Sequence, residues 1–287
     1  MKHLPFFIFA VLFVCLVSIA PALATQPTEW NLNLQTPATP VAEKMFAFHT
    51  LLLWIIGGIT GLVLFLLLFV CFRFNARANP VPATFTHNTK IEIVWTLVPV
   101  MLLAVIAWFS FPLMYYGDRA PHAPEMTLKV TGYQWYWGYE YLEPPEESTL
   151  PKDMTGINFM ANMVPDSEID TEKGQLRLLS TDNVVVLPVD TVVQIQVTAA
   201  DVIHSFAVPA FGIKTDAVPG RLNEVWVKIQ RPGKYYGQCS EICGINHAFM
   251  PIEIHAVSKE EFAAWVAQAK VKFGAYDTGI KLASVRQ

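Results

Sequence analysis

Hydrophobic residues are concentrated in the first 116 residues of the 287-residue chain, whereas most acidic residues come later. Two long apolar runs, at 45–72 and 93–116, are each long enough to cross a bilayer as a helix. The second run has Trp95 near its start and Tyr115 and Tyr116 at its end, where interfacial aromatic residues are common. The pattern therefore predicts a transmembrane helical hairpin over residues 45–116.

A shorter apolar run begins the chain. Residues 1–24 have Lys2 near their start, an apolar middle and Ala-Leu-Ala at 22–24, a pattern typical of a cleavable secretory signal. The alternative is a further transmembrane helix, but the run is short and Pro21 interrupts it. We therefore predict a signal peptide at 1–24, followed by an exported N-terminal segment at 25–44.

The loop between the two long runs predicts the orientation of the hairpin. It carries Arg73, Arg77 and Lys90 and has no acidic residue before Glu92. Because positive charge is retained on the cytoplasmic side, both ends of the hairpin should face outward. The signal peptide and the charge bias thus agree that the globular part is exported.

The part of the chain after the hairpin has the pattern of an all-β domain. Short β-rich runs, among them one at 175–179, are separated by turn signals such as Pro219-Gly220 and Pro232-Gly233, which favours a sandwich or barrel. Residues 133–141 have an aromatic residue at every odd position, which puts five rings on one face of a single strand. The Pro-rich acidic stretch 142–174 is predicted to be a long surface connection.

Residues 258–287 are predicted to form a C-terminal amphipathic helix and tail. Ser258 and Glu261 have the spacing of a capping box at the start of this helix. The formal net charge of the whole chain is −4, and we expect no nucleic-acid partner.

Soft metal ligands are crowded in one stretch, GQCSEICGINHAFMP at 237–251. Cys239 and Cys243 are the only cysteines of the predicted exported domain, since Cys15 lies in the signal and Cys71 in a membrane helix. In an oxidising compartment they could form a disulfide. With one or two histidines they could bind zinc.

Copper is the third alternative. Met250 supplies a thioether, which favours copper, and His204 on an earlier β-rich run could join Cys243 and His247 as a ligand. The second thiolate, Cys239, is one too many for a single trigonal copper, but two thiolates could bridge two ions. Ligand count alone leaves copper, zinc and a disulfide open.

The chain from Phe48 onward resembles the cytochrome c oxidase subunit 2 family. The resemblance is carried by GYQWYWGYEY at 132–141, DVIHSFAVPAFGIKTDAVPGRLNE at 201–224 and YYGQCSEICGINHAFMP at 235–251. It implies a two-helix transmembrane hairpin followed by an all-β, cupredoxin-like Greek-key barrel at 117–257. It also implies a dinuclear copper centre, CuA, in that barrel.

The resemblance implies a role for each matching residue. The CuA ligands would be His204, Cys239, Glu241 through its carbonyl oxygen, Cys243, His247 and Met250. The Glu241 carboxylate would bind magnesium or manganese at the interface with subunit 1. Trp135 would be the site of electron entry where cytochrome c docks, with Asp201 as an acidic docking residue. Glu92 would take up protons, although by itself it is also an ordinary acidic residue at a helix start.

The implied function is that of an electron-entry subunit of a respiratory, proton-translocating oxidoreductase. Electrons from cytochrome c would pass through CuA to haem in subunit 1, where oxygen is reduced, and subunit 3 and membrane lipid are further expected partners. The implied location is the bacterial inner membrane, with the N-terminus and the C-terminal domain in the periplasm. A quinol oxidase subunit would lack the copper ligands, and nitrous-oxide reductase would lack the hairpin.

Overall fold

The computed structural model describes residues 27–28 and 30–274, so the predicted signal peptide at 1–24 lies outside the described residues. Two compact units are present. One runs from Val41 to Pro121, and the other combines the described residues before and after it. The second unit contains all the β-strands and is called the β domain below.

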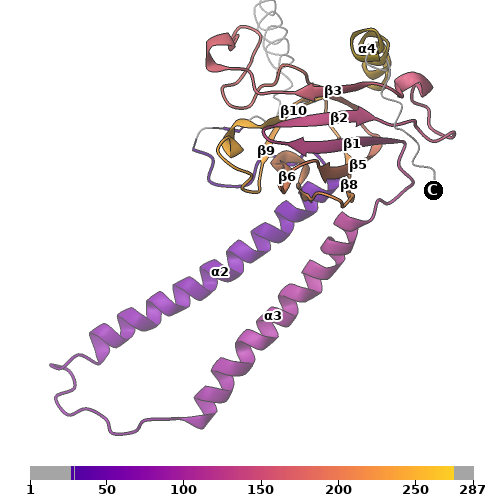
Figure 1. Cartoon of the computed structure of the whole chain (residues 1–287). Coiled ribbons are helices and arrows are strands. Elements are labelled where there is room, and N and C mark those ends of the chain that lie inside the picture. The colour runs from indigo at the N-terminus through magenta and orange to yellow at the C-terminus, as the bar shows by residue number, and fades with distance from the viewer. Residues whose placement is uncertain (1–26, 29, 275–287) are drawn as a thin grey trace, which may run out of the picture. The chain divides into compact units, whose positions relative to one another are not determined.

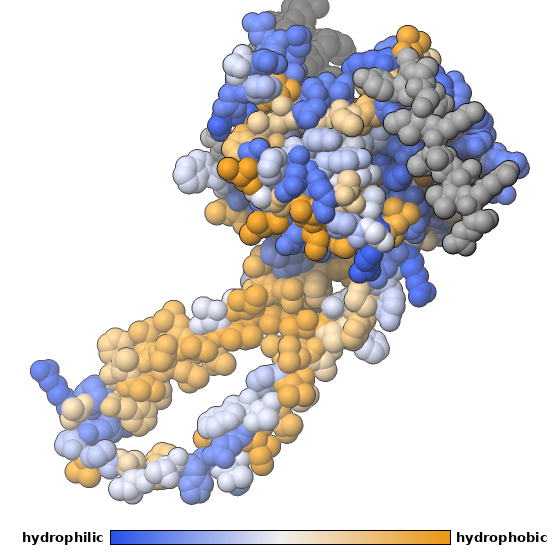
Figure 2. All heavy atoms as spheres, viewed as in Figure 1, coloured by the Kyte–Doolittle hydropathy of each residue, from blue (hydrophilic) through white to orange (hydrophobic). Residues whose placement is uncertain are grey.

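The first unit contains helices α2, Pro40–Arg73, and α3, Thr89–Asp118 (Figure 1). Both are long and apolar enough to cross a membrane, and Figure 2 shows hydrophobic residues along both. Asn88 caps α3 by accepting hydrogen bonds from the backbone N–H groups of Lys90, at 3.1 Å, and Ile91, at 3.3 Å. Each helix begins before and ends after the apolar run that predicted it, because polar residues extend its ends.

The β domain consists of two five-stranded sheets, and Figure 1 labels strands of both. The first sheet has the order β3 (Asn158–Ala161), β2 (Tyr136–Tyr141), β1 (Met126–Tyr133), β5 (Val192–Ala199) and β8 (Asn223–Lys228). The second has the order β4 (Val185–Pro188), β10 (Pro251–Val257), β9 (Gly233–Cys239), β6 (His204–Val208) and β7 (Ile213–Ala217). The β1–β5 and β4–β10 pairs are parallel and the others antiparallel.

Alternating residues of the strands form one core between the two sheets. On β1 the buried positions are Met126, Leu128 and Val130, and the residues between them are partly exposed. The Trp137 ring of the first sheet meets the Phe206 ring of the second edge-on, with 5.4 Å between centroids. The predicted cupredoxin-like β domain is therefore confirmed.

Helix α4, Lys259–Phe273, covers one edge of this core. It buries Phe262, Val266 and Ala269, which recur at helical spacing. Ser258 and Glu261 form the capping box at its start. The predicted C-terminal amphipathic helix is confirmed.

The residues just before α2 are bound to the β domain by their backbone. The Ala38 N–H donates to the Ala210 carbonyl at 2.8 Å, and the Gln230 N–H donates to the Ala38 carbonyl at 2.9 Å. The Thr39 hydroxyl donates to the Phe211 carbonyl at 2.7 Å. This part of the predicted 25–44 segment is thus anchored on the domain surface.

The prediction that residues 133–141 form one strand with five rings on a face is wrong. Tyr133 ends β1 and Tyr136 begins β2, opposite each other in the antiparallel register, so residues 134–135 form a turn. Only Trp137, Tyr139 and Tyr141 share the buried face. The turn raises Trp135 out of the sheet, because a two-residue connection cannot keep the strand's alternation.

Two smaller predictions are also wrong. The stretch 142–174 is not only a surface connection, because it contains β3, which pairs with β2, and buries Leu150, Met154 and Ile157. Residues 175–179 contain no strand, and 177–179 form a turn.

Candidate metal centre

The ligand loop, residues 240–250, joins two neighbouring strands of the second sheet. Strand β9 ends at Cys239, and β10 begins at Pro251, which lies opposite Gln238. Strand β6 begins with His204 and lies on the other side of β9. The sheet therefore brings a histidine and a cysteine that are 35 residues apart to the same place.

Backbone hydrogen bonds hold the ends of the ligand loop. The Cys239 N–H donates to the Met250 carbonyl at 3.3 Å, which closes the loop at its base. The Ser240 N–H donates to the Ser205 carbonyl on β6 at 3.0 Å. The loop is thus fixed to both strands that carry candidate ligands.

Gly244 allows the loop to bend. Its φ of +127° lies in a region that only glycine adopts without strain, and an added Cβ would lie 2.9 Å from the Trp135 ring. The His247 N–H donates to the Gly244 carbonyl at 3.2 Å and begins the short 3₁₀ helix His247–Phe249. This bend turns the second half of the loop back towards the cysteines.

Two candidate donors surround the sulfur of Cys239. His204 Nδ1 lies 3.9 Å from Cys239 Sγ, and the Glu241 carbonyl oxygen lies 3.3 Å from it. Cys239 and His204 are both buried, with exposed fractions of 6% and 0%. Their burial limits the access of water to these donors.

Two more candidate donors surround the sulfur of Cys243. His247 Nδ1 and Met250 Sδ each lie 3.6 Å from Cys243 Sγ. The ligand atoms of His204, Cys239 and Cys243 all lie within 4.8 Å of one another. All six residues that the resemblance marks as ligands are therefore brought together.

The two cysteines do not form a disulfide in this structure. Their sulfurs are 3.9 Å apart, whereas a disulfide bond is about 2.05 Å long. Both cysteines are free. Their separation suits two thiolates that share metal ions between them.

The two thiols differ in acidity. Burial opposes ionisation of Cys239, but hydrogen bonds with His204 and with the backbone lower the pKa of its thiol to about 6. Burial and the neighbouring Cys239 charge raise the pKa of the Cys243 thiol to about 12. The pair therefore loses one proton readily, and a bound cation would be needed to displace the second.

Asp201 orients the imidazole of His204. Its Oδ1 lies 2.9 Å from His204 Nε2, which leaves Nδ1 directed towards Cys239. Asp201 also accepts hydrogen bonds from the backbone N–H groups of Gln134, at 2.7 Å, and Val202, at 2.6 Å. Burial raises the pKa of this carboxyl, but these hydrogen bonds and that with His204 bring it below its ordinary value.

The donor set fits a pair of copper ions better than zinc. A structural zinc ion takes four ligands, whereas six donors converge here, and three of them are sulfur. A thioether beside thiolates favours copper. The residues that would hold the pair are His204, Cys239, Cys243, His247 and Met250, with the Glu241 carbonyl.

Trp135 lies in the β1–β2 turn and contacts the ligand loop. It is half-buried, and its Nε1–H donates to the Cys243 carbonyl at 3.2 Å. The side-chain amide of Gln134 donates to the same carbonyl at 2.8 Å. Sequence reasoning missed Gln134, since only its position beside Trp135 could have drawn attention to it.

Exposed apolar side chains surround the ligands. Ile242 and Ile245 on the ligand loop are 83% and 86% exposed, and Phe249 is 43% exposed. Ile203, next to His204, is also exposed. Apolar side chains gathered on one surface often mark a protein interface. This group was also missed in the sequence, where these residues look like ordinary β or loop positions.

The remaining predicted residues lie outside the sulfur cluster. The Glu241 side chain is exposed. Glu92 is in the first turn of α3, in the other unit, where it is partly buried and accepts a hydrogen bond from the Asn88 N–H at 3.3 Å. This contact suits an acidic residue at a helix start, and the role of Glu92 in proton uptake stays a prediction.

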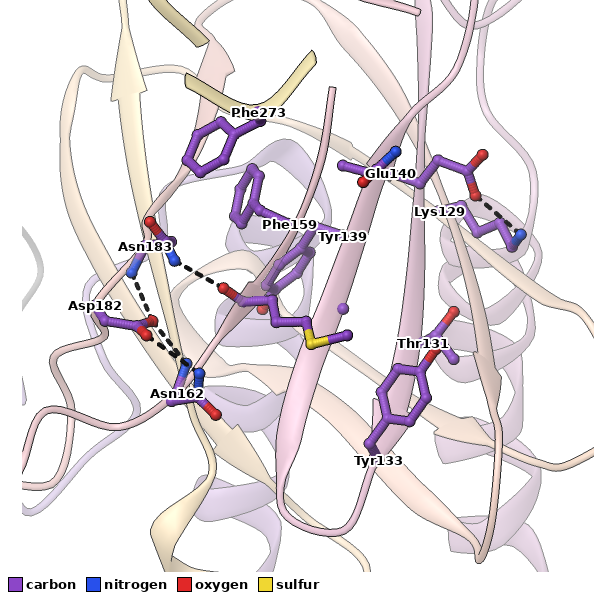
Figure 3. Close-up of a pocket in the computed structure, with 13 residues that line it drawn as sticks. Lys129, Thr131, Tyr133, Tyr139, Glu140, Phe159, Asn162, Asp182, Asn183 and Phe273 are labelled. Carbon is purple, nitrogen blue, oxygen red and sulfur yellow. Dashed lines mark hydrogen bonds and ion pairs between the residues drawn. The ribbon is translucent and has the colours of Figure 1, made fainter. Parts of the chain in front are cut away.

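A separate pocket of about 490 Å³ lies beside β1, β2 and β3 (Figure 3). Its lining includes the Lys129–Glu140 ion pair, at 3.0 Å, and the stacked rings of Phe159 and Phe273. Among the described residues that line it, none is one of the six donors. The candidate centre thus lies at strand ends, outside this cavity.

Both parts of the chain match one protein family. Residues 27–113 match the family model described as cytochrome c oxidase subunit II, transmembrane domain. Residues 126–257 match the one described as cytochrome c oxidase subunit II, periplasmic domain.

Individual relatives cover most of the chain. The chain is 48% identical over 261 residues to the probable cytochrome c oxidase subunit 2 of Rickettsia bellii (strain RML369-C). This match covers 91% of the chain and 92% of that protein. Subunit 2 of Cereibacter sphaeroides is 46% identical over 252 residues, covering 85% and 82%. A crystal structure of the periplasmic domain of subunit II of cytochrome oxidase (CoxB) of Bradyrhizobium japonicum is 49% identical. It covers 54% of this chain and 99% of that one, with a TM-score of 0.46.

Proposed function

The chain belongs to the cytochrome c oxidase subunit II family, and we propose that its β domain is the electron-entry site of the oxidase, built on a dinuclear copper centre. The observation that carries the proposal is the convergence of six donors, two of which are free thiols 3.9 Å apart. A disulfide would need the sulfurs in bonding contact, and a lone zinc ion would leave donors unused.

The chain's own residues would hold and tune the copper pair. Cys239 and Cys243 would bridge the ions, and His204 and His247 would bind one ion each. Asp201 would keep the His204 imidazole in the tautomer that presents Nδ1. The copper pair would supply one-electron redox chemistry, and the buried, fixed ligands would limit rearrangement during transfer.

Trp135 would receive electrons from cytochrome c. Its ring donates a hydrogen bond to the backbone of Cys243, so a short route joins the ring to a ligand. The exposed Ile242, Ile245 and Phe249 would contact protein partners at the same end of the domain. Asp201, with one third of its side chain exposed, would contribute negative charge to docking.

Electrons would pass from this domain to haem in subunit 1, where oxygen is reduced with proton translocation. The two apolar helices make the chain a membrane protein. In the proposed assembly they would span a bacterial inner membrane beside subunits 1 and 3, with the β domain in the periplasm. The Glu241 carboxylate would bind magnesium or manganese facing subunit 1, and Glu92 would take up protons at the cytoplasmic end of α3.

Metal analysis of the copper-loaded full chain tests the proposal. We expect two coppers per chain and a near-infrared mixed-valence absorption. Cys243→Ser should abolish that absorption, because one bridge is lost. Cys71→Ser is the matched control, since Cys71 lies in α2 and should leave the spectrum unchanged. An unchanged spectrum in Cys243→Ser would contradict the bridging arrangement.

A further inference from the structure

Gln134 is hydrogen-bonded to both segments that carry candidate ligands. Its backbone N–H donates to Asp201 Oδ2 at 2.7 Å, and Asp201 Oδ1 in turn lies 2.9 Å from His204. Its side-chain amide donates to the Cys243 carbonyl at 2.8 Å. One residue of the β1–β2 turn thus connects the start of β6 with the middle of the ligand loop.

The two cysteines are positioned in different ways. Cys239 is the last residue of β9, and its N–H is bonded to the Met250 carbonyl. Cys243 lies in the loop beyond the strand, and its carbonyl is bonded to side chains of the β1–β2 turn. The sheet therefore fixes the first sulfur, whereas side-chain hydrogen bonds hold the peptide next to the second.

Close packing makes the Gln134 contact specific. A Cβ on Gly244 would lie 3.2 Å from Gln134 Nε2, closer than most real contacts, so the glycine provides the space that the amide needs. The carbonyl oxygen has two lone pairs, and Gln134 and Trp135 donate to it together. The Gln134 bond is the shorter, at 2.8 Å against 3.2 Å.

We propose that Gln134 is a positioning residue for the metal centre, which holds the Cys243–Gly244 peptide and thereby directs the Cys243 sulfur towards Cys239. Its effect on copper rests on the proposed function, but the hydrogen bond itself can be tested without metal. A neutral hydrogen bond contributes ~1 kcal/mol, which corresponds to about a fivefold change in an equilibrium or a release rate. Loss of this bond should loosen one bridging ligand and leave the other in place.

A labelled, metal-free full chain in detergent tests the hydrogen bond directly. Cys243 is the only cysteine followed by glycine in the sequence. With carbonyl-¹³C cysteine and ¹⁵N glycine, a carbonyl–amide correlation spectrum therefore contains one peak, that of Cys243–Gly244. In Gln134→Leu we expect an upfield shift of this carbonyl resonance, because a donor is lost.

Two further variants serve as controls in the same spectrum. Gln134→Glu keeps the shape and polarity of the side chain but has no side-chain N–H, so it should shift the peak in the same direction. It takes the place of Gln134→Leu if the leucine variant folds poorly. Gln196→Leu removes an equivalent amide, which donates to Glu224 on the neighbouring strand, and should leave the peak in place. A carbonyl resonance that stays unchanged in both Gln134 variants would overturn the proposal, whatever the metal content.

The copper-loaded chain gives the second readout. Gln134→Leu should still bind two coppers, since all six donors remain, but should release copper to a chelator about fivefold faster. The paramagnetic shifts of the Cys243 β-protons should change, whereas those of Cys239 should change less. Release and shifts identical to those of the unmodified chain and of Gln196→Leu would overturn the positioning role. Absence of copper from the unmodified chain would instead contradict the proposed function.

Discussion

Two histidine–carboxylate pairs of the β domain have the same separation but different surroundings. His204 Nε2 lies 2.9 Å from Asp201, and His255 Nε2 lies 2.9 Å from Glu253. In the first pair the histidine is fully buried and the carboxylate partly exposed. In the second the carboxylate is buried, with 5% exposed, and the histidine side chain is 30% exposed.

The difference lies in what else each pair contacts. The other ring nitrogen of His204 lies 3.9 Å from a cysteine sulfur. The second oxygen of Glu253 accepts the Thr181 N–H at 2.8 Å, which ties β10 to the chain before β4. A histidine–carboxylate pair therefore does not by itself mark a metal site. The cysteine sulfur beside the other ring nitrogen makes His204 a candidate metal ligand, whereas the contacts of the second pair are those of a pair that stabilises the fold.

The strongest test of this difference replaces each histidine. His204→Gln should lose the copper pair almost completely, because one ion loses its only imidazole, and mixed-valence absorption should disappear. His255→Gln should bind two coppers like the unmodified chain. Metal content and the near-infrared spectrum measure both. Copper loss in His255→Gln alone would reverse the roles assigned to the two pairs.

A smaller effect is expected when the carboxylates are made neutral. Asp201→Asn retains an acceptor but loses the charge that supports the ring of His204, and partners of metal-bound histidines typically alter affinity by ~10–100-fold. Glu253→Gln should leave copper affinity unchanged. Competition with a copper chelator gives both values. Equal affinities in the two variants would show that Asp201 does not act on the ligand.

The smallest effect is on the stability of the metal-free chain, and here the order of the pairs reverses. Glu253→Leu removes the acceptor of the buried Thr181 N–H and of His255, which should cost about 2 kcal/mol in the free energy of unfolding. Asp201→Leu should cost less, because its backbone donors lie near solvent and can bond to water, and because the buried His204 can carry its proton on Nδ1, which faces Cys239, instead of on Nε2. Denaturant unfolding of both variants measures this. A larger loss in Asp201→Leu would contradict the structural role given to Glu253.

The membrane helices could be predicted from the sequence because their signal is local. A lipid-facing helix needs only a long apolar run and satisfies its own backbone hydrogen bonds, so residues 45–72 and 93–116 indicated α2 and α3 without any partner. The bounds differed by a few residues, where polar caps such as Asn88 extend the helix.

The ligand set was predictable for a different reason. Cys239, Cys243, His247 and Met250 lie in one short stretch with ligand chemistry, and His204 lies on an earlier β-rich run from which it could join them. The family resemblance marked these same residues as copper ligands. The contacts around them were not predictable, since Gln134 and Cys243 are 109 residues apart and meet only when the two sheets pack together. The turn at Trp135 likewise depends on the register of β1 with β2.

The central claim is that two thiolates share two copper ions, and native mass spectrometry of the copper-loaded full chain tests it most directly. The account predicts a mass increase of two coppers with Cys239 and Cys243 both reduced. A mass that corresponds to a disulfide between these cysteines, or to a single bound zinc ion, would contradict it.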